Sequence, residues 1–134
     1  MRACVLDTDV VIAALDRGDA HHREAVTAIS SMIEERLPML ISPINYAEAL
    51  VRPAQEEATL RAARHAIDVL GIRPVTATAT IGVAAARHRS LGVSLADGFA
   101  LATAEAHSAT IASFDERVRR AAGRMGLDAP VQMS

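Results

Sequence analysis

The chain has 134 residues, of which 51% are hydrophobic and 22% charged, and its formal net charge is −2. This composition is typical of one soluble globular domain and excludes a disordered chain, so residues 1–134 are treated as a single domain. All 14 basic side chains are arginines. The absence of lysine excludes a P-loop and any Schiff-base mechanism, and leaves carboxylates, histidine, hydroxyls and arginine for chemistry.

Short apolar runs alternate with helical patterns along the chain. Strands are predicted at residues 3–6, 38–41, 72–75 and 109–112, with a further short strand at 129–133. Helices are predicted at residues 10–15, 20–36, 43–51, 55–70, 76–91, 95–107 and 116–122. Ser42 followed by Pro43 marks a helix start, and Gly71 and Gly92 mark helix ends. This alternation predicts an α/β fold with a short parallel sheet covered by helices on both faces.

The compartment is inferred from the cysteine content and the apolar segments. The only cysteine, Cys4, lies in an apolar run and is expected to be a buried thiol in a reducing environment. Asp7 and Asp9 interrupt the apolar stretch near the N-terminus, which argues against a signal peptide. No apolar segment approaches the roughly 20 residues that span a bilayer. We therefore expect a cytoplasmic protein that does not contact membranes.

Four acidic residues stand out from their surroundings. Asp7 and Asp115 lie where the first and the fourth predicted strands end, and Glu48 and Asp97 lie on predicted helices among apolar neighbours. Sites in parallel sheets form at the carboxyl ends of the strands. Carboxylates about 5 Å apart repel one another by about 3 kcal/mol per pair at an effective dielectric constant near 20. Several such pairs require either a cation or raised pKa values, and an all-carboxylate cluster is the ligand set that hard divalent ions such as Mg²⁺ or Mn²⁺ prefer.

Each acid also has a purely structural explanation. Asp97 follows Ser94 at the spacing of a helix capping box, and Asp115 precedes a predicted helix that it would cap. Asp7, Thr8 or Asp9 would cap the first helix, and Glu48 would face solvent. Taken one residue at a time, the spacing leaves both explanations open.

Four segments together resemble the PIN domain family, in particular its small VapC-type toxins. They are residues 5–12 (VLDTDVVI), 42–50 (SPINYAEAL), 93–98 (VSLADG) and 109–115 (ATIASFD). The resemblance covers nearly the whole chain and implies a PIN-like three-layer fold. It also implies a metal-dependent endoribonuclease that hydrolyses RNA phosphodiester bonds as the toxin of a toxin–antitoxin pair.

The resemblance assigns roles to these acids. The catalytic quartet would be Asp7, Glu48, Asp97 and Asp115. Asp7 and Asp97 would be the main ligands of Mg²⁺ or Mn²⁺, with Asp115 completing the metal site. Glu48 would bind a second ion or orient the attacking water, and Ser113 would supply a hydroxyl. Family partners are RNA, with transfer and ribosomal RNA as precedents, a cognate antitoxin and a second copy of the chain.

Three residues depart from the family pattern. Asp9 stands where serine or asparagine is more usual, and it would either ligate metal or cap a helix. Gly98 replaces a common alanine, which weakens a helix by up to about 1 kcal/mol. Phe114 precedes Asp115 where polar residues are frequent. These departures affect metal number and substrate fit, and leave the quartet intact.

Arginine and aromatic side chains are the candidate contacts for RNA. Arg117, Arg119 and Arg120 follow Asp115 closely and would hold backbone phosphate, although a solvated helix face explains them equally well. The side chains able to stack on bases are Tyr46, Phe99 and Phe114. The five histidines show no zinc-binding spacing and are expected to have surface or packing roles.

Two alternatives remain beside the nuclease. The segment Val5-Leu6-Asp7-Thr8-Asp9 also resembles the Asp-x-Asp signature of haloacid-dehalogenase phosphatases, but those enzymes usually need a lysine. The other alternative is a non-catalytic PIN-like module that binds RNA or a partner without cutting.

Overall fold

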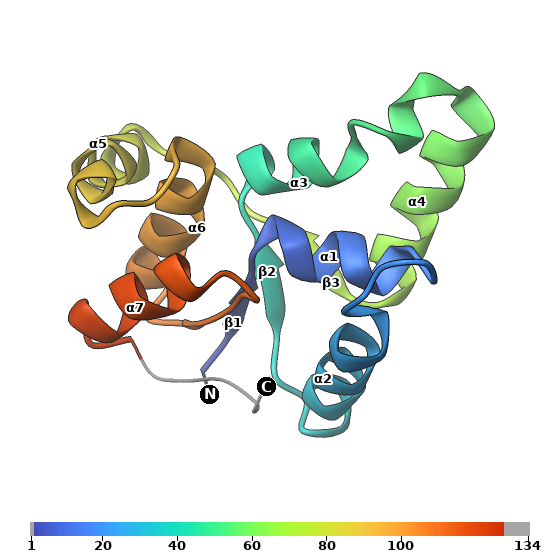
Figure 1. The fold of residues 1–134 in the computed structure, drawn as a ribbon, viewed down its shortest axis with the longest axis horizontal. Coiled ribbons are helices and arrows are strands. Elements are labelled where there is room, and N and C mark those ends of the chain that lie inside the picture. The colour runs from blue at the N-terminus through green and yellow to red at the C-terminus, as the bar shows by residue number, and fades with distance from the viewer. Residues whose placement is uncertain (1, 128–134) are drawn as a thin grey trace.

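A four-stranded parallel sheet forms the centre of the protein, whose computed structural model describes residues 2–127 (Figure 1). The strands are β1 (Cys4–Leu6), β2 (Met39–Ile41), β3 (Ile72–Pro74) and β4 (Thr110–Ala112), in the order β3-β2-β1-β4. Every neighbouring pair is parallel. These strands confirm the four predicted within the described residues, whereas the predicted strand at residues 129–133 lies outside them.

Seven α-helices and two short 3₁₀ turns connect and cover the described strands. The helices are α1 (Thr8–Leu15), α2 (His22–Glu34), α3 (Pro43–Leu50), α4 (Glu57–Val69), α5 (Ala79–His88), α6 (Leu95–Ala106) and α7 (Glu116–Arg124). The 3₁₀ turns are η1 (Pro53–Gln55) and η2 (Arg89–Leu91). Helix α1 begins two residues earlier than predicted because Asp7 caps it, and α5 begins after a Thr78 cap.

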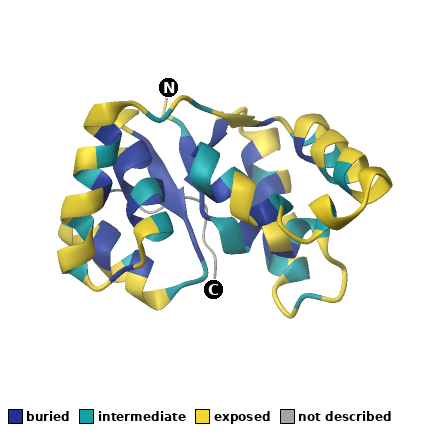
Figure 2. Cartoon of the chain, turned by 90° about the horizontal axis from the view of Figure 1, so that it is seen from above, coloured by how far each residue is buried: buried dark blue, intermediate teal, exposed yellow. Residues whose placement is uncertain are grey.

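The alternation of side chains along each strand divides the core between two faces of the sheet. Cys4 and Leu6 pack with residues of α1, α2, α3 and α4, whereas Val5 between them packs with α6 and α7. Buried residues accordingly gather on the strands and on the helix sides that face them (Figure 2). The predicted α/β architecture with helices on both faces is therefore confirmed.

Helices α5 and α6 lie in close contact at Gly98. A Cβ atom built at Gly98 would lie 2.7 Å from the carbonyl oxygen of Ala85, closer than real Cβ atoms approach backbone. Ile81, Ala85 and Ala102 fill the remaining contact between the two helices. The glycine predicted to weaken the helix is therefore required for this close packing.

The environment of Cys4 and the lengths of the helices agree with two sequence expectations. Cys4 is fully buried and unbonded to other cysteines, and burial raises the pKa of its thiol to about 11. Within residues 2–127, each helix is too short or too polar to cross a bilayer.

Candidate active site

Polar side chains gather where the parallel strands end. Asp7 follows β1 directly, and Ser113 and Asp115 follow β4, which pairs with β1 in register through Leu6 and Ala112. Helix α6 adds Asp97 in its first turn, and α3 adds Glu48. We call Asp7, Asp9, Glu48, Asp97 and Asp115 the carboxylate cluster.

Asp7 is the most buried member of this cluster, with 1% of its surface exposed. Its Oδ1 accepts a hydrogen bond from the backbone N–H of Thr8 at 2.9 Å, and its Oδ2 accepts one from the Ser113 hydroxyl at 2.7 Å. Burial, followed by the negative charges of Asp9 and Asp97, raises the pKa of Asp7 to about 7 despite the hydrogen bond from Ser113, which lowers it. Asp7 is therefore a buried acid that a nearby cation would stabilise in its charged form.

Asp9 is not the helix cap that was one of its two expected roles. Asp7, and not Asp9, caps α1, while Asp9 Oδ2 accepts a hydrogen bond from the backbone N–H of Phe114 at 3.1 Å. Its other oxygen, Oδ1, is buried and has no hydrogen-bond partner among the described residues. Burial, together with the charges of Asp115 and Asp97, raises the pKa of Asp9 to about 6. A buried carboxylate oxygen without a donor suits a cation.

Asp115 forms the helix cap that its sequence position predicts. Its Oδ1 accepts a hydrogen bond from the backbone N–H of Arg117 at 2.8 Å, and Arg117 Nη2 lies 3.5 Å from Oδ2. Burial raises its pKa, but the hydrogen bonds and positive charge of Arg117 outweigh burial and lower the pKa below its ordinary value. Asp115 thus stays charged at neutral pH.

Ser113 joins the two aspartates that follow β1 and β4. Its hydroxyl donates to Asp7, and the same oxygen accepts a hydrogen bond from the backbone N–H of Asp115 at 3.0 Å. The predicted hydroxyl is thus within the site, where it donates to one candidate ligand and fixes the backbone of another.

Asp97 and Glu48 reach the cluster from helices. The backbone N–H of Asp97 bonds to the Ser94 hydroxyl at 3.1 Å, so the predicted serine cap of α6 is formed. After burial, the negative charge of Asp97 contributes to the raised pKa of both Asp7 and Asp9. Glu48 is exposed, and its Oε1 accepts a hydrogen bond from the Thr8 hydroxyl at 2.7 Å.

The carboxylate cluster suits a divalent cation that keeps much of its water. Within residues 2–127, no group of three or more His, Cys, Asp or Glu side chains is arranged as a ready metal site. Mg²⁺ is usually bound by one or two carboxylates and several waters, and so does not require such a group. The raised pKa values of Asp7 and Asp9 and the buried Oδ1 of Asp9 all favour a positive charge here. The donor set therefore fits Mg²⁺ or Mn²⁺.

The three predicted RNA-binding arginines have different surroundings. Arg117 lies against Asp115, and Arg120 lies 4.0 Å from Glu116; both side chains are about two-thirds exposed, at 68% and 67%. Arg119 is half-buried, and its Nε donates to the carbonyl oxygen of Ser113 at 2.8 Å. Arg119 therefore supports the loop that carries the site, and Arg117 and Arg120 are the better placed to meet a phosphate.

Sequence reasoning missed Thr8, Asn45 and His21. Thr8 and buried Asn45 are hydrogen-bonded to each other at 3.0 Å beside Glu48. The His21 ring stacks on Phe114, with ring centroids 4.4 Å apart. The polar character of Asn45 within the apolar start of α3 was the signal that could have identified it. No local pattern could have placed His21 against a residue of the β4–α7 loop.

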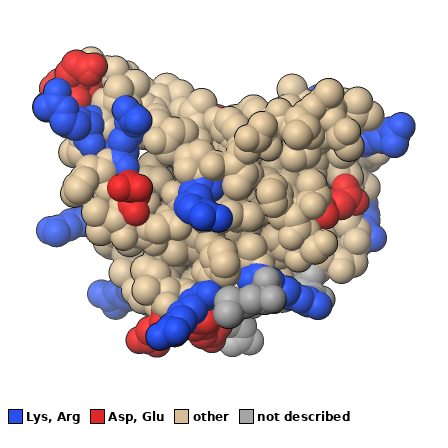
Figure 3. Space-filling view, turned by 180° about the vertical axis from the view of Figure 1, so that it is seen from behind, with Lys and Arg blue, Asp and Glu red and all other residues tan. Residues whose placement is uncertain are grey.

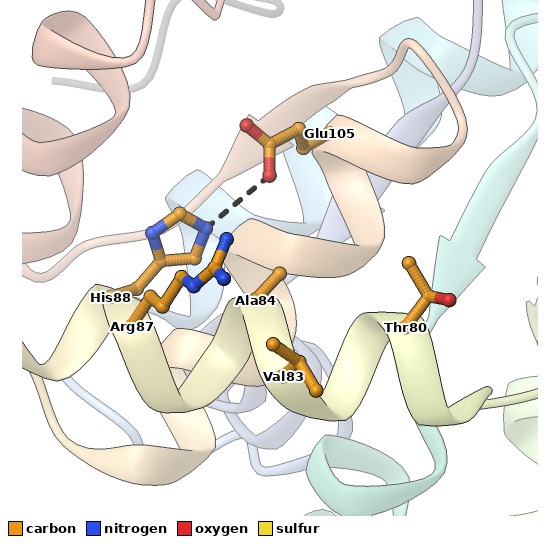
Figure 4. Close-up of a pocket in the computed structure, with 6 residues that line it drawn as sticks. All are labelled: Thr80, Val83, Ala84, Arg87, His88 and Glu105. Atoms are coloured by element: carbon orange, nitrogen blue, oxygen red, sulfur yellow. Dashed lines mark ion pairs between the residues drawn. The ribbon is translucent and has the colours of Figure 1, made fainter.

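A pocket of about 390 Å³ lies between α5 and α6 and shares no residue with the carboxylate cluster (Figure 4). His88 Nε2 faces Glu105 Oε1 across it at 3.4 Å. Glu105 is about two turns farther along α6 than Asp97. On the back of the molecule, acidic and basic side chains are scattered and do not form one patch (Figure 3).

The fold and the site define a parallel α/β domain with carboxylates at the carboxyl edge of its sheet. The chain belongs to the PIN domain family, which matches residues 4–124. No curated protein sequence matches it.

Among solved structures, the chain is similar to VapC20 of Mycobacterium tuberculosis, a sarcin–ricin loop cleaving toxin, with 19% identity. For VapC20 itself the TM-score is 0.69, covering 89% of this chain and 95% of that one. FitAcB of Neisseria gonorrhoeae is 24% identical, with a TM-score of 0.64 and coverage of 90% and 93%. A toxin–antitoxin complex from Klebsiella pneumoniae is 23% identical, with a TM-score of 0.65 and coverage of 84% and 87%. At these identities, the three structures establish the shared fold.

Proposed function

We propose that this protein is a Mg²⁺- or Mn²⁺-dependent endoribonuclease and the toxin of a toxin–antitoxin pair. The observation that carries the proposal is the meeting of Asp7, Asp9, Asp97 and Asp115 at one edge of the sheet. Burial, followed by the charges of Asp9 and Asp97, raises the pKa of Asp7 to about 7. Burial, followed by the charges of Asp115 and Asp97, raises the pKa of Asp9 to about 6. Membership of the PIN domain family supports the same reaction class.

Asp7 and Asp97 are the proposed main metal ligands, with Asp115 completing the site and Asp9 as a further candidate. A bound divalent ion lowers the pKa of its water and neutralises charge on a phosphoryl group. Ser113 orients Asp7 by donating to its Oδ2, which leaves the carboxylate in one position within the site. Glu48 is exposed and held by Thr8, and it is proposed to orient the water that attacks phosphorus.

RNA is the proposed substrate, with transfer or ribosomal RNA as the two candidate classes. Arg117 and Arg120 are exposed on the helix that Asp115 caps, and a guanidinium group suits contact with backbone phosphate. Arg119 would contribute by fixing the loop that bears Ser113. The description of VapC20 as a toxin that cleaves the sarcin–ricin loop supports ribosomal RNA as the first substrate to test.

A small antitoxin is the proposed protein partner, because the similar structures include a toxin–antitoxin complex. The protein is further proposed to act in the cytoplasm as a homodimer. Co-expression with the product of a neighbouring small gene tests this role. The neighbour should relieve growth arrest caused by this chain, and failure to relieve it would count against the toxin assignment.

Cleavage by the purified protein, freed of any partner, tests the nuclease. Transfer RNA and ribosomal RNA fragments should be cut with Mg²⁺ or Mn²⁺, left intact with EDTA, and left intact by Asp97→Asn. Mn²⁺ binding measured by calorimetry should weaken in the same variant. A protein that binds RNA yet leaves it intact with every divalent ion would establish the non-catalytic module instead. The match to the PIN domain family favours the nuclease over the phosphatase alternative.

A further inference from the structure

A chain of hydrogen bonds runs from the end of β2 to the carboxylate cluster. Ser42 Oγ donates to Asn45 Oδ1 at 2.5 Å, and Asn45 Nδ2 donates to Thr8 Oγ1 at 3.0 Å. Thr8 Oγ1 donates in turn to Glu48 Oε1 at 2.7 Å. The bonds link α3 to α1 and return to α3 one turn farther on, so they end on a member of the cluster.

The direction of this chain is fixed by a second contact of Asn45. Its Nδ2 also lies 3.2 Å from the carbonyl oxygen of Ala96, which can only accept a hydrogen bond. The atom facing Ala96 and Thr8 is therefore the NH₂ group, and Thr8 must accept from it. The single hydroxyl proton of Thr8 is then left for Glu48, since its other acceptor, the carbonyl of Asn45, lies farther away at 3.4 Å.

Asn45 thereby ties together α3, α1 and α6, three of the helices that position the cluster. It is fully buried on α3, bonds to Thr8 beside Asp7 on α1, and bonds to Ala96 beside Asp97 on α6. A buried amide with all these bonds made is rigid, because breaking any one leaves a desolvated polar group. Glu48 itself is exposed, so the Thr8 hydroxyl is what holds it against α1.

We propose that Asn45 and Thr8 are positioning residues that act through Glu48. Asn45 fixes the orientation of the Thr8 hydroxyl, and Thr8 holds the Glu48 carboxylate against α1. The expected change in RNA cleavage rests on the proposed function, whereas the expected position of Glu48 rests on the hydrogen-bond geometry alone.

The paired variants Thr8→Val and Thr8→Ser separate the hydroxyl from the shape of the side chain. Thr8→Val should lower kcat for RNA cleavage roughly 10- to 100-fold with KM little changed, since a hydrogen bond to a charged group is lost and RNA contacts are not. Thr8→Ser should restore kcat. In a Glu48→Gln background, Thr8→Val should lower kcat little further, because both changes act on the same side chain.

Crystal structures of the metal-free variants test the positioning without any activity. In Thr8→Val the Glu48 side chain should leave α1, and in Thr8→Ser it should keep the parent position. Glu48 unmoved in Thr8→Val would overturn the proposal, whatever the RNA assay shows. A parent protein that cuts no RNA, combined with the expected movement of Glu48, would instead refute the nuclease and retain the positioning role.

A second inference rests on the ring contact between His21 and Phe114. The rings are stacked at 4.4 Å with an interplanar angle of 14°. Phe114 lies between Ser113 and Asp115, and Asp9 fixes its backbone N–H, so the stack borders the carboxylate cluster. Phe114 also packs against the core, whereas the His21 side chain is 51% exposed.

We infer that His21 and Phe114 form a platform on which one base of single-stranded RNA stacks. Phe114 covers one face of the His21 ring, whose side chain is half exposed and has its Nδ1 3.6 Å from Glu24 Oε1. Phe114 joins this ring to the loop that carries Ser113 and Asp115, and stacking on an aromatic ring is tolerant of base identity. This inference also rests on the proposed RNA substrate.

Binding of fluorescein-labelled single-stranded RNA to the Asp97→Asn protein tests the platform without cleavage. His21→Ala should weaken binding about tenfold, and His21→Phe should retain it, because stacking on one base contributes about 1–3 kcal/mol. His65→Ala, at an exposed histidine of α4, is the matched control and should bind as the parent does. RNA with an abasic nucleotide at the stacked position should bind His21→Ala and the parent with equal affinity.

Equal RNA affinities of His21→Ala and His65→Ala would overturn the platform. Loss of binding in both variants would overturn it too, because the effect would not depend on the stacked ring. A parent that binds RNA with the expected dependence on His21 but cuts nothing would refute the nuclease and leave the platform standing.

Discussion

The junctions that follow β1 and β4 begin alike and differ in electrostatics. The two strands are paired neighbours, and each is followed by an aspartate that caps a helix: Asp7 for α1 and Asp115 for α7. Asp7 is buried beside two other carboxylates, and its pKa is raised to about 7. Asp115 is beside Arg117, and its pKa is lowered.

The difference teaches that one sequence pattern yields two chemical environments. A strand followed by an aspartate and a helix predicts a cap at both junctions, and both caps form. Depth and neighbouring charge then decide which carboxylate needs a cation to be ionised. Ser113 connects the two environments through one hydroxyl.

The largest expected effect is on catalysis at the β1 junction. Asp7→Asn should lower Mg²⁺-dependent RNA cleavage at least about 1000-fold, because a neutral amide at this position of the cluster binds the ion poorly. Asp68→Asn, at an exposed position on α4, is the control and should cleave as the parent does. Initial rates with a ribosomal RNA fragment measure both. Near-parental cleavage by Asp7→Asn would remove Asp7 from the proposed site.

The pH dependence of stability should differ in sign between the junctions. With a folded-state pKa of about 7 and an unfolded value of about 3.9, Asp7 binds more protons when folded between these pH values. The free energy of unfolding of metal-free protein should therefore fall as pH rises from about 4 to about 7, by on the order of 3 kcal/mol from this residue. Asp115, with its lowered pKa, should instead contribute stability above its unfolded pKa that is lost as pH falls through its folded value.

Urea unfolding in EDTA across this pH range measures the slopes. Asp7→Asn should flatten the decline, leaving the smaller part due to Asp9, whose pKa is raised to about 6. Asp115→Asn should leave the decline in place. Equal slopes in parent and Asp7→Asn would contradict the buried state of Asp7.

Metal should oppose this loss of stability. Mg²⁺ at 100 times its Kd should raise the free energy of unfolding by about 2.7 kcal/mol. The gain at a fixed Mg²⁺ concentration should be larger at pH 8 than at pH 6, because Asp7 and Asp9 are then charged without competition from protons. Melting temperatures with Mg²⁺ or EDTA at both pH values measure it. A gain that is independent of pH would place the ion elsewhere.

The helix that brings Asp97 to Asp7 depends on a glycine. Gly98→Ala should destabilise the protein by about 1–2 kcal/mol, because the clash with the Ala85 carbonyl exceeds the gain in helix propensity. Gly82→Ala on α5 is the matched control. No atom lies within 4 Å of a Cβ built there, so it should stabilise by about 0.5–1 kcal/mol. Chemical denaturation distinguishes the two, and stabilisation by Gly98→Ala would show that α5 and α6 can separate at no cost.

The smallest effect should come from the hydroxyl between the two junctions. Ser113→Ala removes the donor to Asp7 and the acceptor of the Asp115 N–H, and should cost about 1 kcal/mol. It should also raise the pKa of Asp7 further, since the hydrogen bond from Ser113 lowers it. NMR titration of the Asp7 carboxyl and urea unfolding measure the two effects, with Ser30→Ala on α2 as control. An unchanged Asp7 pKa would mean that the bond contributes little.

Much of the fold was predictable because its signals are local. Four apolar runs gave the four described strands, and Ser42, Ser94 and Asp115 gave three helix starts. The start of α5 was predicted too early, since the Thr78 cap is a weaker signal than an alanine-rich run. Helix propensity alone predicts that Gly98 weakens α6. The close contact with the Ala85 carbonyl on α5 instead makes glycine the residue that fits there.

The sequence by itself determined where strands and helices alternate along the chain and which carboxylates follow strands, because both depend on residues adjacent in the chain. Only the tertiary structure decided the state of each carboxylate. Asp7 and Asp115 occupy equivalent local positions, yet their pKa values shift in opposite directions. Likewise, Asn45 bonds to Thr8 and Ala96, and His21 stacks on Phe114. Burial, charge and hydrogen bonding between distant segments act through space, and no local pattern encodes them.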